Sequence, residues 1–165
     1  MEEALGKLQI PLTILRPAWF IDNAAWDVAS ARDTGLIYSF LQPTDKAFPM
    51  VAAKDVGLLD AKLIREDWTG THIVELEGPS RITPNDLADA FTRVIGKPVR
   101  AVPVPRESWN ALFRSQGMKN PEPRMRMLDG FNEGWIEFEG DRSKVIKGST
   151  NAVDVIADLV ANTQS

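Results

Sequence analysis

Apolar and polar positions along this chain follow two periods, and the order in which these periods appear predicts an α/β fold. A near-continuous apolar run at 12–15 indicates a parallel strand covered on both faces, which ends at Pro17 because proline cannot donate to a β-ladder. Further strands are expected from short or alternating apolar runs, at 36–41, 48–51, 71–76 and 99–104. Further helices are expected from helical spacing, at 2–8, 24–32, 106–116 and 121–131. No linker or repeat divides this pattern, so residues 1–165 are expected to form a single domain.

Three more helices are predicted from local start signals. In Thr83-Pro-Asn-Asp86 a capping hydroxyl is followed by proline at the first helical position and by an acid three residues on, which predicts a helix that Gly96 ends. Asn151 is expected to cap a last helix over 152–162. Asp55 is expected to cap a helix in the middle of the chain in the same way.

A ligand site is predicted just beyond the strand at 12–16, because open α/β sheets bind ligands at the carboxyl ends of their strands. Trp19, Phe20 and Asn23 stand at that point. The alternatives are that the two rings pack under a loop and that Asn23 caps the helix that follows. Other large apolar side chains are expected either to line a mostly apolar pocket or to pack in the core, namely Trp26, Phe48, Met50, Trp109 and Phe113.

Single polar residues give little evidence of catalysis. His72 is the only histidine and has no nucleophile motif beside it, so it is expected to pack in the core or at a sheet edge. Arg16 lies within an apolar strand and is expected to pair with a carboxylate or a carbonyl. One histidine and scattered acids predict no metal site. The catalytic residues therefore stay unassigned.

Composition narrows the classes of partner. The net charge of −4 argues against nucleic acid, whose phosphates require clustered lysine and arginine. The absence of cysteine excludes disulfides and fits a reducing compartment. No apolar run approaches the roughly 20 residues of a membrane span. We expect a cytoplasmic protein whose partner is a small-molecule ligand.

Three segments, in this order and at these separations, carry a resemblance to a known family: Leu12-Thr-Ile-Leu-Arg-Pro-Ala-Trp-Phe-Ile-Asp-Asn23, Met50-Val-Ala-Ala-Lys-Asp-Val-Gly57 and Leu76-Glu-Gly-Pro-Ser-Arg-Ile-Thr83. They resemble the back half of NmrA-like proteins, atypical short-chain dehydrogenase/reductase relatives with a Rossmann fold that binds NAD(P). The resemblance covers nearly the whole chain. It implies the carboxyl-terminal part of a doubly wound parallel sheet with the substrate-side lobe. It also implies that the backbone of Pro17, Ala18, Trp19 and Phe20 lies against the nicotinamide end of the cofactor.

The resemblance lacks two motifs. None of the eleven glycines fall at G-x-G-x-x-G or G-x-x-G-x-x-G spacing, so the amino-terminal dinucleotide-binding βαβ units are absent and are expected to precede Met1. The Tyr-x-x-x-Lys pair of reductases is absent too, because Tyr38, the only tyrosine, is followed four positions later by Gln42. Three functions stay open: an NAD(P)H-dependent oxidoreductase for a small carbonyl or quinone-like substrate, a non-catalytic NAD(P)-sensing regulator, and a small-molecule-binding protein without nucleotide.

The strand at 12–16 also predicts assembly. By resemblance, its neighbours on one side lie before Met1, which leaves an unpaired apolar edge. Because two-fold association is the commonest solution for soluble chains, we expect a homodimer that covers this edge.

The missing glycine-rich turn gives a first prediction. The pyrophosphate of a dinucleotide is held mainly by the backbone N–H groups of that turn and of the helix start behind it. The 165-residue chain alone is therefore expected to bind NADPH and NADH weakly or not at all in isothermal titration calorimetry. Micromolar affinity for either nucleotide would contradict this prediction and would indicate a phosphate site elsewhere in the chain.

Overall fold

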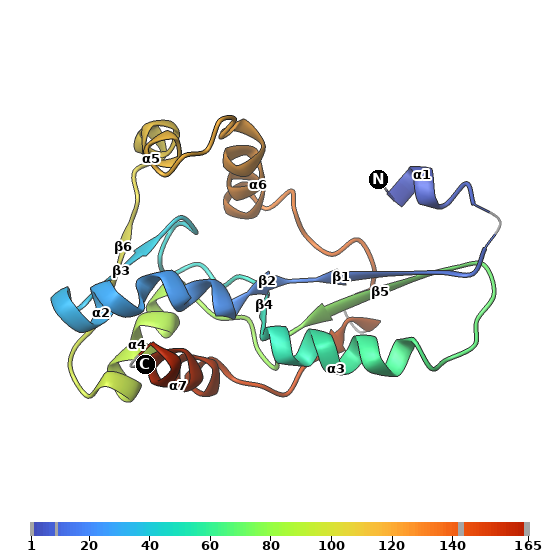
Figure 1. The fold of residues 1–165 in the computed structure, drawn as a ribbon, viewed down its shortest axis with the longest axis horizontal. Coiled ribbons are helices and arrows are strands. Elements are labelled where there is room, and N and C mark those ends of the chain that lie inside the picture. Colours follow the sequence, from blue (N-terminus) through green and yellow to red (C-terminus); the bar gives the residue numbers. More distant parts are fainter. Residues whose placement is uncertain (1, 9, 142–143, 164–165) are drawn as a thin grey trace.

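The computed structural model describes residues 2–8, 10–141 and 144–163, and its strands pair in parallel (Figure 1). The longest sheet has the order β1-β5-β7, formed by β1 (Leu12–Pro17), β5 (Thr71–Glu77) and β7 (Ile146–Lys147). Two shorter parallel pairs continue it, β2 (Trp19–Phe20) with β4 (Met50–Val51) and β3 (Leu36–Ser39) with β6 (Arg100–Pro103). This arrangement confirms the predicted fold class, a partial Rossmann-like α/β fold.

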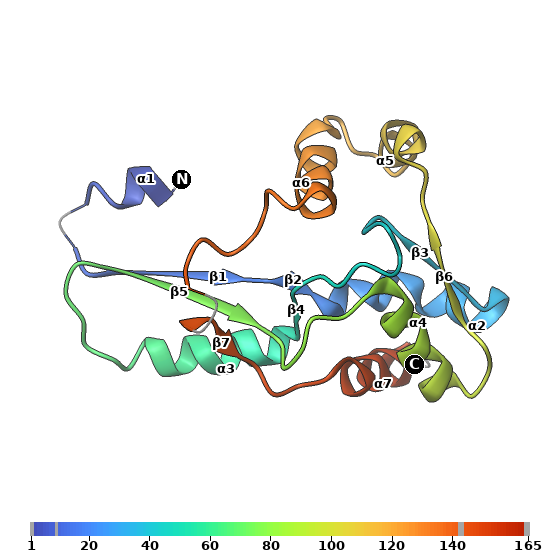
Figure 2. The same ribbon diagram turned by 180° about the vertical axis from the view of Figure 1, so that it is seen from behind.

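Helices lie on both sides of these strands (Figures 1 and 2). Their bounds are α1 (Glu2–Leu5), α2 (Val28–Thr34), α3 (Ala53–Leu63), α4 (Pro84–Ile95), α5 (Trp109–Ser115), α6 (Glu122–Glu133) and α7 (Ala152–Asn162), with 3-10 helices η1 (Ile21–Asp27) and η2 (Arg106–Ser108). Helix α3 runs below β1 and β5, and α4 packs against α7. Helices α5 and α6 stand apart on the opposite side, and residues 106–133 are called the cap below.

The chain changes its pairing partner at Pro17. Up to this residue β1 pairs with β5, ending with Pro17 opposite Leu76. The backbone N–H of Ala18 still donates to the Leu76 carbonyl at 2.8 Å, but Trp19 then pairs with Met50 of β4. Strand β1 therefore ends at Pro17, as predicted, and the chain turns from β5 toward β4 there.

The strongest local signals in the sequence form as predicted. The Thr83 hydroxyl accepts from the Asp86 N–H at 2.9 Å and the Asp86 carboxylate accepts from the Thr83 N–H at 2.7 Å, which is a complete capping box. Gly96 ends α4 in the left-handed conformation, with φ of 79°. The Asn151 side chain caps α7 by accepting from the Asp154 N–H at 3.0 Å.

Two expected caps are wrong. Asn23 lies inside the 3-10 helix η1, and α2 begins later, at Val28. Asp55 lies in the first turn of α3, behind the cap position at Ala52. Asp55 is 5% exposed, and its carboxylate accepts two hydrogen bonds from Thr150, from the backbone N–H at 2.9 Å and from the hydroxyl at 2.8 Å. Asp55 therefore joins α3 to the loop before α7.

That loop approaches the Asp55 carboxylate very closely. A Cβ atom at Gly148 would lie 2.3 Å from an Asp55 carboxylate oxygen, so only glycine allows this approach. The two hydrogen bonds between Thr150 and Asp55, together with the lack of a side chain at Gly148, fix the course of the loop that leads into α7.

Strand β1 differs from its prediction in burial. Each of its residues is only half-buried, although a strand covered on both faces was expected. Within the described part of the chain β5 is its sole strand partner, so the other edge of β1 has no ladder. A homodimer that covers this edge stays a prediction.

The Asp55 junction gives a stability prediction. Replacing the residue in Asp55→Ala removes both acceptors and leaves a backbone N–H unpaired inside the protein. We expect the free energy of unfolding to fall by about 3 kcal/mol in urea denaturation. Asp60→Ala, at an exposed position of the same helix, is the control and should change it by less than about 0.5 kcal/mol. Equal effects of the two substitutions would contradict the role given to Asp55.

Candidate functional site

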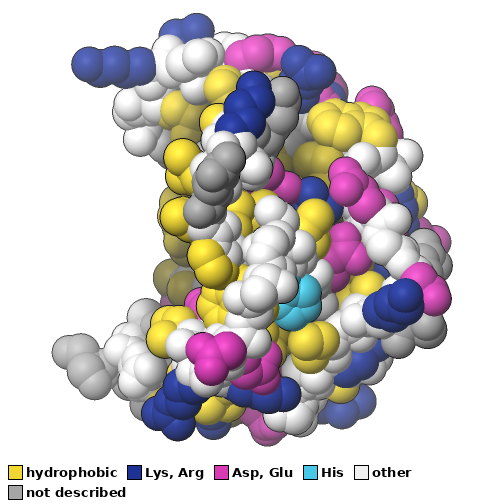
Figure 3. All heavy atoms as spheres, turned by 90° about the vertical axis from the view of Figure 1, so that its right-hand side faces the viewer, with side chains coloured by type: hydrophobic (Ala, Val, Ile, Leu, Met, Phe, Trp, Pro, Cys, Tyr) yellow, Lys and Arg dark blue, Asp and Glu magenta, His cyan; other side chains and the backbone are white. Residues whose placement is uncertain are grey.

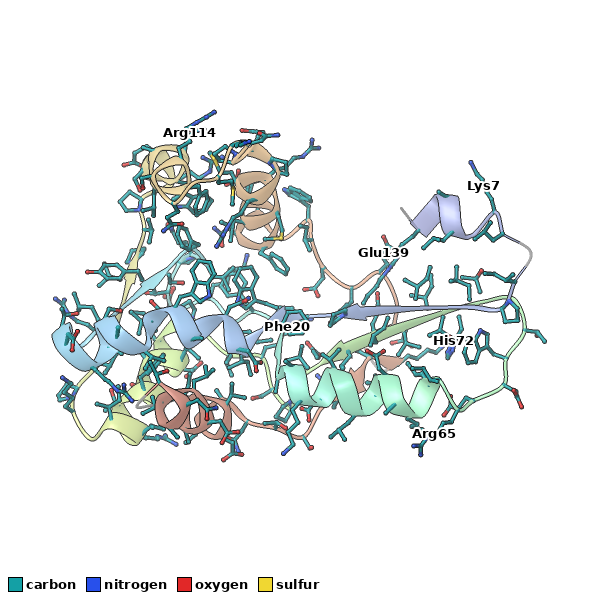
Figure 4. The ribbon with its side chains drawn as sticks, viewed as in Figure 1. Lys7, Phe20, Arg65, His72, Arg114 and Glu139 are labelled. Carbon is teal, nitrogen blue, oxygen red and sulfur yellow. The ribbon has the colours of Figure 1, made fainter. Side chains whose placement is uncertain are left out.

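A cavity of about 940 Å³ lies at the carboxyl ends of β1, β2 and β3. Its walls come from residues 17–21, from η1, from residues 37–41 and from the inner side of the cap. Phe20 lies at the point where the strands give way to η1 (Figure 4). The sequence predicts a ligand site at this position, because open α/β sheets bind ligands at the carboxyl ends of their strands. In the structure, the change of strand partner after Pro17 lies at the same point.

Most of the predicted site residues meet at this cavity. Those that line it are Pro17, Ala18, Trp19, Phe20, Asn23, Trp26 and Met50. They come from two segments of the chain, residues 17–26 and Met50 of β4, which the pairing of β2 with β4 brings together.

Phe48 and Trp109 do not reach the cavity, so their expected place in the pocket is wrong. Phe48 is 1% exposed, and its backbone pairs with Ile82. Trp109 is also 1% exposed and packs inside the cap, where its indole N–H donates to the Val104 carbonyl at 2.9 Å. Phe113 is equally buried there. For these three residues the alternative interpretation, packing in the core, is correct.

Aromatic rings form the walls between the sheet and the cap. Trp19 meets Phe131 of α6 edge to face, with ring centroids 5.5 Å apart. Phe40, which follows β3, contacts Trp109 at 5.7 Å and Phe113 at 5.1 Å. Trp19, Phe40 and Phe131 thus give the cavity an apolar aromatic wall, and Trp109 and Phe113 pack against Phe40.

The cap is fixed to the rest of the molecule by the end of α6. The Asn132 side chain accepts from the Gln42 N–H at 2.8 Å and donates to the Phe40 carbonyl at 2.9 Å. Lys46 donates to the Asn132 carbonyl at 2.6 Å, and the Gln42 side chain donates to the Val104 carbonyl at 2.6 Å. Asn132 of the cap is therefore tied to the loop after β3 by three hydrogen bonds, and a fourth joins that loop to Val104, which precedes the cap.

Ionisable side chains are few in the cavity wall, and they are Asp27, Tyr38 and Arg124. Burial raises the pKa of the Asp27 carboxyl group, and the hydrogen bond that it accepts from the Tyr38 N–H at 2.9 Å opposes this in part. Arg124 lies on α6, in the part of the cap that lines the cavity. No motif in the sequence marks Asp27 or Arg124 as site residues, and only the tertiary fold places them here.

Two other singled-out residues lie away from the cavity. Arg16 donates to the carboxylate of Glu139 at 2.8 Å and also to that of Glu2, which confirms the expected carboxylate partner. His72 is exposed, on a stretch of β5 that β7 does not reach, so the edge interpretation holds. Figure 3 shows this histidine at the surface, and hydrophobic side chains along a concave margin of the same view.

A second hollow, of about 570 Å³, lies between the starts of α4 and α7. Acids and arginines line it together, among them Asp86, Asp154, Arg81 and Arg93. Acidic and basic side chains line this hollow together, so it has no excess of positive charge to bind an anion. No aromatic ring borders it, so it also lacks the surface that an apolar ligand needs. Among residues 2–8, 10–141 and 144–163 no three potential ligands gather to hold a metal ion. No helix in this part of the chain is long and apolar enough to cross a membrane.

Comparisons with known proteins agree with this fold. No family model matches the chain. A search of curated proteins finds agroclavine dehydrogenase from Claviceps fusiformis, 26% identical over 133 residues, a match that covers 78% of this chain and 45% of the relative.

Solved structures match at lower identity. The NADPH-dependent quinone oxidoreductase of Escherichia coli, in complex with NADPH, has a TM-score of 0.74 at 21% identity, over 96% of this chain and 56% of that one. The triphenylmethane reductase of Citrobacter sp., in complex with NADP(H), has a TM-score of 0.70 at 21% identity over the same shares. The transcriptional regulator NmrA, in complex with NAD, has a TM-score of 0.55 at 16% identity and is covered over 51% of its length.

These matches show that the chain has the fold of NmrA-like, NAD(P)-binding oxidoreductases and regulators. The chain spans about half the length of each of these proteins. The match in fold and length fits the carboxyl-terminal portion that the sequence predicts.

The raised pKa of Asp27 predicts a pH-dependent stability difference. A carboxyl group whose pKa is higher in the folded state than in the unfolded chain favours folding most when it is protonated, and it destabilises the protein as pH rises through the folded-state value. Asp27→Asn keeps an acceptor for the Tyr38 N–H and carries no charge. We expect it to be more stable than the parent at pH 7, with the gain falling toward zero below the ordinary aspartate pKa of 3.8.

Urea denaturation between pH 3 and pH 7.5 measures this gain, whose slope is at most about 1.4 kcal/mol per pH unit. Asp33→Asn, at an exposed position of the next helix, α2, serves as the control and should show little such slope. A gain from Asp27→Asn that does not change with pH would contradict the prediction.

Proposed function

We propose that this chain is the substrate-binding half of an NAD(P)H-dependent oxidoreductase that reduces a small, planar carbonyl or quinone-like acceptor. The observation that carries the proposal is the aromatic cavity at the strand ends, which opens beside the segment 17–20. A flat apolar acceptor buries its faces against Trp19, Phe40 and Phe131, and the cap limits the access of water to it.

The residues at the rim fit the nicotinamide end of the cofactor. Trp19 and Phe20 are partly exposed and offer apolar contact to a flat heteroaromatic ring. The exposed amide of Asn23 offers a donor and an acceptor to a carboxamide at the same rim. When bound, the reduced cofactor supplies a hydride to the acceptor. The role of the chain is then to hold the acceptor beside the rim and to exclude water from it.

The proton that accompanies a hydride has candidate sources in the cavity wall. The Tyr38 side chain and the Asp27 carboxyl group both line it. Because burial raises its pKa, the Asp27 carboxyl keeps a proton at higher pH than an ordinary aspartate does. The similarity to enzymes that carry NADPH or NADP(H) in their crystal structures supports this assignment of the cavity.

A sensing role is the second candidate, and the match to the regulator NmrA favours it. One measurement separates the two roles. A protein that joins this chain to a dinucleotide-binding half should oxidise NADPH, followed at 340 nm, when menadione or 9,10-phenanthrenequinone is added. Binding of the nucleotide without any quinone-dependent oxidation would favour the sensor and would overturn the enzymatic proposal.

Phe20 provides the mutational test of the cavity. In that joined protein Phe20→Ala removes part of the rim, so we expect the KM for the quinone or the Kd for NADPH to rise about tenfold, a loss of roughly 1.4 kcal/mol. The ring is half-buried, so unfolding should cost less than the roughly 3–5 kcal/mol expected for a core phenylalanine. Thermal denaturation checks the stability. A collapse of the melting temperature with unchanged affinity in the folded fraction would show that Phe20 acts only in packing.

A further inference from the structure

Arg124 is a partly buried cation in the cavity wall that has no oxygen acceptor in the described structure. The other partly buried arginines do have one: Arg16 and Arg81 donate to carboxylates, and Arg32 donates to the Val160 carbonyl. None of the hydrogen bonds or ion pairs among residues 2–8, 10–141 and 144–163 involves Arg124. Its planar group of five N–H donors is therefore open to a ligand.

Aromatic rings hold this guanidinium group in place. Its central carbon lies 4.6 Å from the ring centroid of Phe113, 5.5 Å from that of Trp26 and 6.0 Å from that of Phe40. Cation–π contacts of this kind orient the group but leave its N–H donors unused. Of these rings, Trp26 and Phe40 line the cavity, and Phe113 packs in the core beside it.

The second charged group of the cavity does not neutralise Arg124. Asp27 accepts from the Tyr38 N–H in β3, and no ion pair between it and Arg124 is formed in the described structure. A guanidinium taken partly out of water without an acceptor costs free energy, and an anionic oxygen in the cavity would offset that cost by a charge-assisted hydrogen bond.

This inference rests on the proposed function and deepens it. We propose that Arg124 determines specificity, by binding an anionic oxygen, a carboxylate or a phenolate, on a planar aromatic substrate whose rings occupy the cavity. Among aromatic carbonyl and quinone-like substrates, those that carry an anionic group are then preferred, and neutral quinones are accepted with lower affinity. Arg124 positions the substrate and takes no part in transferring a hydride or a proton.

Two other arginines of the cap show that position, rather than charge alone, makes Arg124 special. Arg126 lies on the same helix, is exposed and does not line the cavity. Arg114 of α5 projects away from the molecule (Figure 4) and donates to the Asn110 side chain at 3.0 Å. Arg126 therefore provides a matched control with the same charge on the same helix.

The test uses the 165-residue chain, without nucleotide, and two probes of nearly the same shape. Anthraquinone-2-carboxylate carries the anion, and anthraquinone-2-carboxamide is its neutral counterpart. Binding is followed by quenching of tryptophan fluorescence, since Trp19 and Trp26 both line the cavity. We expect the carboxylate to bind at least about tenfold more tightly than the amide, the range of a charge-assisted hydrogen bond. Arg124→Met should abolish this preference, Arg124→Lys should keep part of it, and Arg126→Met should leave it unchanged.

Each outcome decides one question. Equal binding of the two probes by the parent chain, or an unchanged preference in Arg124→Met, would overturn the role of Arg124 and leave the proposed function standing. A preference lost equally in Arg126→Met would assign it to the general charge of the cap and would also overturn that role. If neither probe binds, the cavity is not a site for planar acceptors, and the proposed function fails together with this inference. Near-ultraviolet circular dichroism confirms the fold of each variant, and Arg124→Lys decides alone if Arg124→Met does not fold.

Discussion

The backbone hydrogen bonds around Pro17 are the constraint on which the site depends. Pro17 is the last residue in register with β5, and one residue later the chain pairs with β4 instead. After β5, the Gly78 N–H donates to the Met50 carbonyl at 2.6 Å, which joins the end of β5 to β4. A Cβ atom at Gly78 would lie 2.6 Å from that same oxygen, so a side chain there would prevent this contact. A proline without a donor and a glycine without a side chain therefore turn one strand from β5 toward β4, and the cavity lies where it turns.

The cap covers one side of this opening in the sheet. Its attachment depends on Asn132, whose amide satisfies one backbone carbonyl and one backbone N–H of the loop after β3. Since the same helix carries Arg124 and Phe131, any movement of that attachment moves a cation and an aromatic wall together.

What the sequence predicted well was local in origin. The capping box at Thr83, the cap at Asn151 and the glycine stop at Gly96 need only a few neighbouring residues, and all three form. The predicted cap at Asp55 was wrong because its partner, Thr150, lies 95 positions away in the sequence. An acidic residue near the start of a helix gives the same sequence pattern whether it caps that helix or binds a distant loop. The position of residues 17–20 at the cavity could be predicted because the end of a strand has a recognisable sequence pattern. The place of Arg124 in the cavity wall could not, because it depends on how α6 packs over the sheet.

The edge of β1 that has no partner in the described structure could pair with a further strand, and the direction of that strand depends on its origin. Every strand pair in the described sheet is parallel. A dinucleotide-binding half built like those of the related structures would extend this sheet in the same sense. In a regular ladder between two copies of β1, a two-fold axis makes the strands antiparallel, so that such a dimer holds one mixed sheet with its two cavities at opposite ends. The relative direction of the strand beside Leu12–Pro17 thus distinguishes a completed nucleotide-binding fold from a symmetric pair of identical chains.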